Sequence, residues 1–187
     1  MEGSFWTLEH TAAALLLLGN LVVFPGLIMF WVRGGVQGHP PPNRAYFIWE
    51  RGFIIGGIIF TAIGFLLLEW HLQASPGRAL GLIGAVAYLV GGILGAGAEI
   101  LGLLDRYRFQ YPITVAYVIL AFIGQAIIGA AFLQAGLLAG WIGAAAIIWN
   151  LAWLVALPLL TPRDIYFPVL HHVMPLIIGI ALLLAAM

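Results

Sequence analysis

Five ionisable side chains lie inside apolar stretches that are long enough to cross a lipid bilayer. They are Glu50, Arg51, Glu99, His171 and His172. A charged side chain at the centre of a membrane helix costs roughly 2.5–3.5 kcal/mol on insertion scales, so such residues either pair with one another or mark a functional site. Carboxylates and imidazoles transfer protons, and a guanidinium holds anionic groups. These five residues are therefore the first candidates for chemistry in this chain.

The elements that must position these residues are six apolar runs, each close to the ~20 residues that a membrane helix needs. The runs cover about 12–32, 45–68, 79–104, 113–135, 138–160 and 165–187. The boundary between the fourth and fifth runs is the weakest, because only Gln134, Gly136 and Gly140 mark it. The pattern predicts an all-α fold, a polytopic integral membrane bundle of six transmembrane helices that forms one domain over residues 1–187.

The composition supports this fold class and excludes several others. The chain is 64% hydrophobic and 7% charged, whereas soluble domains have about 25% charged residues. A formal net charge of zero and the lack of a basic run argue against a nucleic-acid partner. The sequence has no cysteine, and all seven basic residues are arginine, so disulfides, iron–sulfur clusters and lysine Schiff bases are excluded. The acidic start, MEGSFWTLEH, favours a retained first helix over a cleaved signal peptide.

The distribution of arginine predicts how the bundle is oriented. The loops after the first, third and fifth runs, with the adjoining helix ends, carry Arg33, Arg44, Arg51, Arg106, Arg108 and Arg163. The other side carries only Arg78. Under the positive-inside rule, the arginine-rich loops lie in the cytoplasm and both termini lie outside. The expected location is the cell (inner) membrane, with membrane lipids as the surrounding partners.

The five ionisable residues are expected at one depth. Glu50 and Arg51 lie five or six residues into the second run, and Glu99 lies five residues before the end of the third. His171 and His172 lie six or seven residues into the sixth run. At about 1.5 Å per residue, all five should lie about 8–10 Å below the cytoplasmic boundary. We therefore expect one polar layer.

Small residues indicate which way the two carboxylates face. Gly91 and Gly95 precede Glu99 at intervals of four, which places all three on one helix face. Glu50 shares its face with Thr61 and with two glycines of the same run. Faces of small residues let membrane helices approach closely, so both carboxylates should point into the bundle rather than towards lipid.

Two interpretations of the layer remain open. In the first, Arg51 and Glu99 form a structural ion pair, while Glu50 and a histidine bind helix ends. In the second, the layer is a ligand or gating site. Gln125 and Asn150 lie deeper in the fourth and fifth runs, where they would either line a path from the layer or form interhelical hydrogen bonds.

No metal or cofactor is predicted. His171 and His172 are sequence neighbours that point about 100° apart on a helix, so they cannot hold a haem from opposite faces. The sequence also lacks the His-x-x-x-His or Glu-x-x-His spacing that would support a metal site.

Three functional hypotheses follow. The preferred one is binding or transport of a small or lipophilic solute, in which Glu50, Arg51, Glu99 and the two histidines gate the site and protons drive the cycle. The first alternative is an accessory or structural subunit, within a homodimer or a larger membrane complex. The second is an enzyme that acts on a lipid or isoprenoid. Glu50, Glu99 or His171 would then be its acid or base.

Overall fold

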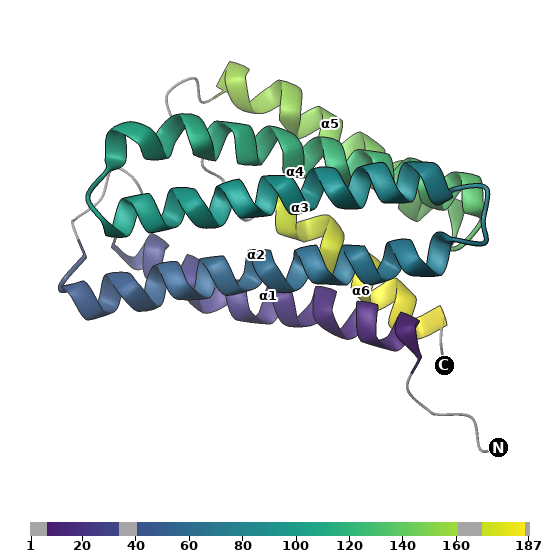
Figure 1. Cartoon of the computed structure of the whole chain (residues 1–187), viewed down its shortest axis with the longest axis horizontal. Coiled ribbons are helices and arrows are strands. Elements are labelled where there is room, and N and C mark those ends of the chain that lie inside the picture. Colours follow the sequence, from purple (N-terminus) through teal and green to yellow (C-terminus); the bar gives the residue numbers. More distant parts are fainter. Residues whose placement is uncertain (1–6, 34–40, 161–169, 186–187) are drawn as a thin grey trace.

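The computed structural model describes residues 7–33, 41–160 and 170–185, and within these ranges every regular element is a helix (Figure 1). The elements are α1 (Leu8–Val32), α2 (Arg44–Leu72), α3 (Arg78–Leu103), α4 (Tyr107–Ala135), α5 (Gly140–Leu160), the 3-10 turn η2 (Leu170–His172) and α6 (Val173–Ala185). The all-α prediction is thus confirmed. The part of the sixth run before Leu170 lies outside the described residues.

Local signals set the ends of several helices. The Thr7 hydroxyl accepts a bond from the His10 amide, and the His10 ring accepts one from the Thr7 amide, which forms a capping box at the start of α1. The Asn43 side chain caps α2 by accepting from the Tyr46 amide at 2.9 Å. Gly136 ends α4 in the left-handed conformation, with φ of 63°. A glycine in this conformation commonly ends a helix, so it accounts for the boundary between the fourth and fifth runs.

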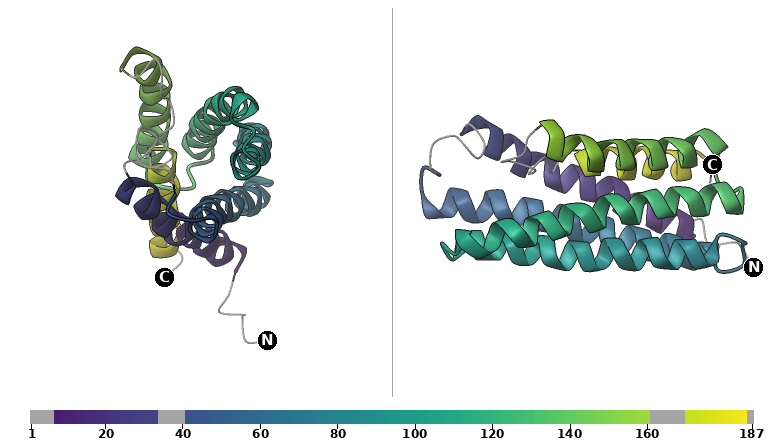
Figure 2. Two further views of the ribbon diagram at one scale, coloured as in Figure 1. Left: turned by 90° about the vertical axis from the view of Figure 1, so that its left-hand side faces the viewer. Right: turned by 90° about the horizontal axis from the view of Figure 1, so that it is seen from above.

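Each long helix packs against the next one in the chain, and α6 packs on α1 (Figures 1 and 2). Successive long helices run in opposite directions, because short connections join their neighbouring ends. The start of α1 and the end of α6 lie at the same end of the bundle. The last described helix is short and begins about halfway along the bundle.

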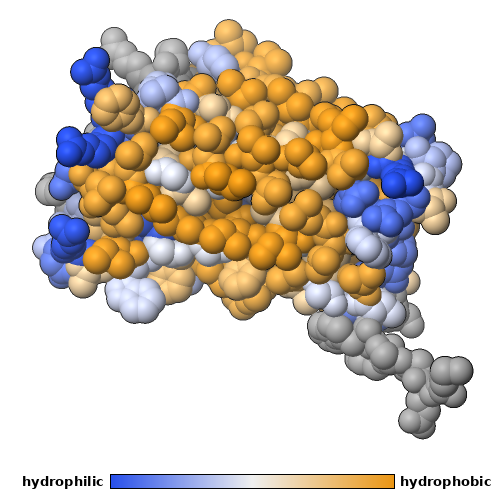
Figure 3. Space-filling view, viewed as in Figure 1, coloured by the Kyte–Doolittle hydropathy of each residue, from blue (hydrophilic) through white to orange (hydrophobic). Residues whose placement is uncertain are grey.

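Five helices, α1 to α5, are long and apolar enough to cross a membrane. The apolar segment Leu170–Ala185 is shorter than those five, so the sixth span stays a prediction. The visible surface is apolar along the middle of the bundle and hydrophilic at both ends, as expected for a body embedded in lipid (Figure 3). Helix α4 begins at Tyr107 rather than near residue 113, and Pro112 lies inside it.

The predicted stripes of small residues face protein. A Cβ built on Gly57 would lie 2.5 Å from the Val23 side chain of α1, and one on Gly95 would lie 2.9 Å from the Tyr117 ring of α4. Thr61 is fully buried against Gly19. Close backbone approach of this kind replaces the hydrophobic effect as the source of cohesion between membrane helices.

Gly84 provides a test of this close packing. A Cβ at Gly84 would lie 2.7 Å from the backbone oxygen of Gly124, which cannot move away without shifting α4. We expect Gly84→Ala to destabilise the purified protein by about 1–3 kcal/mol, as small-to-large changes in packed cores do. The matched control is Gly97→Ala in the same helix, because a Cβ there meets nothing within 4 Å. Equal thermal midpoints for the two variants would refute tight α3–α4 packing.

Candidate functional site

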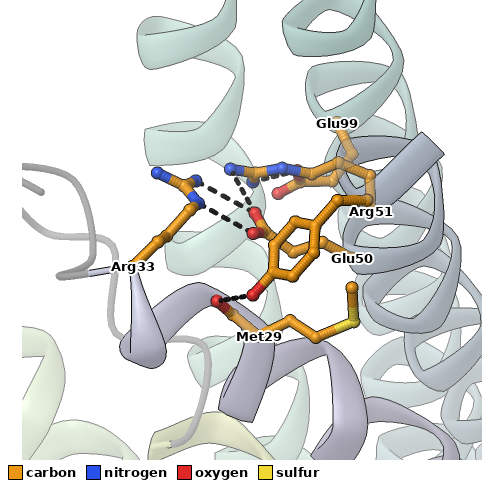
Figure 4. A network of polar contacts seen from close by, with 6 residues as sticks. Met29, Arg33, Glu50, Arg51 and Glu99 are labelled. Atoms are coloured by element: carbon orange, nitrogen blue, oxygen red, sulfur yellow. Dashed lines mark hydrogen bonds and ion pairs between the residues drawn. The ribbon is translucent and has the colours of Figure 1, made fainter. Parts of the chain in front are cut away.

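Four charged side chains form one network at the end of the bundle where α1 ends and α2 begins (Figure 4). Arg33 donates to both oxygens of Glu50, through Nε at 2.8 Å and Nη2 at 3.0 Å. Arg51 reaches Glu50 with Nη2 at 3.1 Å and Glu99 with Nη1 at 2.5 Å. The Arg51–Glu99 contact that the first interpretation expects is present, and Glu50 bridges Arg33 at the end of α1 and Arg51 of α2.

The network is buried and its formal charges cancel. The Glu50 side chain is fully buried, Glu99 is 2% exposed as a residue, and both point into the bundle as predicted. Two arginines and two carboxylates leave no net charge, which satisfies the requirement that ions in a low-dielectric site be paired. Arg51 lies 4.9 Å from the centre of the Phe47 ring, and Arg33 lies 5.1 Å from that of Phe30. Within the described residues, each carboxylate of the network is paired with arginine.

Tyr46 strengthens the junction between α1 and α2. Its hydroxyl donates to the backbone oxygen of Met29 at 2.7 Å, beside the charged network (Figure 4). Met29 lies in the last turn of α1, where backbone oxygens lack partners within the helix. Together with the Arg33–Glu50 pair, this bond fixes the end of α1 on α2. Sequence analysis did not identify Arg33 or Tyr46 as members of the site.

The two histidines lie deeper than the charged network. The His171 Nε2 atom is 2.5 Å from the Tyr117 hydroxyl, and Tyr117 packs against Gly95, one helical turn from Glu99. The structure therefore does not bring His171 and His172 to the charged network. The described part of this segment begins with the 3-10 turn η2 near the middle of the bundle.

Side chains from α4 and α5 hold η2 in place. Gln125 donates through Nε2 to the backbone oxygen of His171 at 2.7 Å. Trp149 donates through Nε1 to the backbone oxygen of Leu170 at 2.8 Å. Gln125 thus contacts the backbone of a predicted site residue, whereas Asn150 bonds its own helix, at the Ala146 oxygen, 2.7 Å away. The structure does not bring Asn150 to the charged network.

His172 lines a cavity between α1 and the η2–α6 segment. The cavity has a volume of about 690 Å³. Its wall consists of Ala14, Leu17, Leu18, Asn20, Leu21, Val23, Phe24, Leu27, His172, Val173 and Leu176. His172 is 3% exposed, and within the described part of the chain neither of its ring nitrogens has a hydrogen-bond partner. The cavity is apolar, with two polar side chains in its wall.

The described residues do not form a metal-binding site. Within residues 7–33, 41–160 and 170–185, no group of three or more His, Asp or Glu side chains is placed to hold a metal ion. Glu50 and Glu99 are engaged by arginine, and His171 is engaged by Tyr117.

No family model, curated protein or solved structure matches this chain. The class of protein therefore follows from the fold itself. Five long apolar helices, packed by small residues around buried and paired charges, define a multi-pass helical membrane protein.

Proposed function

We propose that this protein binds a lipophilic molecule from the bilayer in the cavity between α1 and the η2–α6 segment. The observation that carries the proposal is the apolar cavity itself, which has a volume of about 690 Å³ and is lined by apolar side chains together with Asn20 and His172. Ligand sites are typically apolar cavities of about 300–1,000 Å³ with a few polar groups in their walls.

The position of the cavity supports uptake from the lipid side. Three wall residues of α1 are exposed on the surface of the bundle, namely Leu18 at 37%, Leu21 at 70% and Phe24 at 61%. Because that surface is apolar, a molecule dissolved in the hydrocarbon can reach His172 without crossing water.

The charged network takes a structural role in this proposal. Its four charges are paired, and they join α1, α2 and α3. Gating by Glu50, Arg51 and Glu99 would require these pairs to separate in hydrocarbon. We assign binding to the cavity and anchoring of the helices to the network.

The proposal includes a topology. The arginine-rich end of the bundle faces the cytoplasm of a cell (inner) membrane, and both termini lie outside. The start of α1 and the end of α6 at one end of the bundle support this arrangement. The sixth span predicted over 165–187 belongs to the same proposal.

Native mass spectrometry of protein released from mild detergent tests the proposal. Ala14→Phe places a ring in the cavity wall, whereas Ala87→Phe changes an equally half-buried alanine of α3 outside that wall. We expect a bound lipophile in the wild type and in Ala87→Phe, and its loss in Ala14→Phe. If Ala14→Phe retains the same molecule, the proposed site is wrong. If no variant carries a lipophile and the chain co-purifies with another subunit, the accessory-subunit hypothesis takes its place.

A further inference from the structure

We infer that one end of the bundle binds the headgroups of anionic phospholipids, such as phosphatidylglycerol. The binding surface consists of Arg44, Arg106 and Arg108, which we call the arginine patch. This inference goes beyond the proposed function and is independent of the cavity, because no residue of the patch lies in the cavity wall. It follows from the exposure of the three side chains, the balance of charge at that end and the aromatic side chains beside them.

The three arginines lie at neighbouring helix ends. Arg44 is the first residue of α2, Arg106 immediately precedes α4, and Arg108 lies in the first turn of α4. Helix α3 packs against both α2 and α4, and its end lies beside the starts of both (Figure 1). All three arginines are exposed, whereas Arg51 of the charged network is buried. The patch therefore faces outward at this end of the bundle.

The positive charge of the patch is not balanced by the described part of the chain. Within residues 7–33, 41–160 and 170–185, no ion pair involves an arginine of the patch. The charged network of the same end is neutral, and Asp105 is the one further acidic residue described there. At the opposite end, Glu9 and Glu69 accompany Arg78, so the described charges of the two ends differ in sign.

Exposed aromatic side chains place the patch at the level of lipid headgroups. Trp49 is 63% exposed, Phe109 57% and Tyr111 47%. Trp49 lies five residues after Arg44, which is about 8 Å further into the apolar body. Arg108 lies 6.0 Å from the centre of the Phe109 ring. Aromatic side chains of membrane proteins gather where headgroups meet hydrocarbon, so the partner that fits this surface is membrane lipid rather than a soluble macromolecule.

The chemistry of the patch favours an anionic headgroup over a zwitterionic one. A guanidinium binds a phosphate through two parallel hydrogen bonds, and phosphatidylglycerol leaves its phosphate charge uncompensated. Phosphatidylcholine, in contrast, carries its own cation. Each basic side chain near an anionic membrane surface is worth about a fivefold gain in affinity. Three arginines beside one carboxylate should therefore select phosphatidylglycerol.

Native mass spectrometry of the purified protein, with equal amounts of phosphatidylglycerol and phosphatidylcholine added, tests the inference. We expect the wild type to prefer phosphatidylglycerol, and Arg44→Gln/Arg106→Gln/Arg108→Gln to lower that preference at least about tenfold. Replacing the same three residues by lysine keeps the charge and should retain most of the preference. Arg78→Gln is the matched control, because it removes an exposed arginine from the opposite end.

Salt provides a second readout that damage to the fold would not imitate. Raising ammonium acetate from about 0.1 M to about 1 M shortens the screening length from about 10 Å to about 3 Å, so the preference of the wild type should fall. The preference of the glutamine variant should change little. Thermal midpoints of all variants show whether a loss of lipid reflects unfolding.

Several outcomes would overturn the inference. They are equal binding of the two lipids by the wild type, an unchanged preference in the glutamine variant, and an equal loss in Arg78→Gln. Release of a co-purified acidic protein by the glutamine variant, without a lipid preference in the wild type, would assign the patch to a protein partner instead. Ala14→Phe should keep the preference, so failure of the proposed cavity and failure of the patch are distinguishable. Loss of the preference in Ala14→Phe would place the anionic lipid in the cavity and refute the patch.

Discussion

Glu50→Gln is expected to lower the stability of the protein by about 3–5 kcal/mol, the usual cost of removing one partner from a buried ion pair. The carboxylate is fully buried and accepts from Arg33 at 2.8 and 3.0 Å and from Arg51 at 3.1 Å. Glutamine has nearly the same shape but no charge. The two arginines of the network would then face one carboxylate, Glu99, instead of two.

The double variant Arg33→Gln/Glu50→Gln separates charge balance from general damage to the fold. It removes one charge of each sign, so the network returns to neutrality. We expect its thermal midpoint to be higher than that of Glu50→Gln alone. Glu69→Gln, a half-buried carboxylate at the other end of α2, is the control and should change stability little. A double variant that is less stable than Glu50→Gln would show that charge balance does not govern this site.

The second large effect is expected from loss of the two side chains that hold η2. The double variant Gln125→Leu/Trp149→Phe removes the donors to the backbone oxygens of His171 and Leu170. A buried acceptor that loses its donor costs about 1–3 kcal/mol, so the pair should cost about 2–5 kcal/mol. The loss should be local, because both bonds end on the η2–α6 segment.

Hydrogen exchange checks this prediction. Amides of α6 should exchange at least about tenfold faster in the double variant, while those of α2 and α3 stay as in the wild type. Asn150→Leu/Trp153→Phe is a matched control. Among the described residues, Asn150 bonds only its own helix, and Trp153 does not donate to η2. Faster exchange in the control, or equal acceleration in every helix, would contradict the proposed role of Gln125 and Trp149.

Much of the fold could be predicted because hydropathy and small-residue spacing act locally. Apolar runs located α1 to α5, and the stripes that contain Gly57 and Gly95 showed which faces meet other helices. The ends of helices were less certain. The fourth run was expected to start near residue 113, but α4 begins at Tyr107 and Pro112 lies inside it.

The candidate site was predicted in part. Arg51 and Glu99 were matched because both lie inside apolar runs, where an unpaired charge is costly. Arg33 was missed because it follows the last apolar residue of α1 and was counted as a loop residue. The signal lay in topology: the end of α1 and the start of α2 are neighbours, so Arg33 lies within reach of Glu50.

The position of the histidines could not be read from periodicity. A helix advances about 1.5 Å per residue, so any break in it shifts every later residue in depth. The described segment starts with the 3-10 turn Leu170–His172, which is stabilised by Gln125 and Trp149 from helices distant in sequence. Tertiary contacts of this kind carry no local sequence pattern.

The charged network also constrains the order in which the chain assembles during synthesis. Once α1 and α2 have emerged, the hairpin holds Arg33, Glu50 and Arg51, which sum to one positive charge within the apolar layer. Among the described residues, the compensating carboxylate is Glu99 of α3. The charges of the network therefore balance across the three helices as a set rather than one by one.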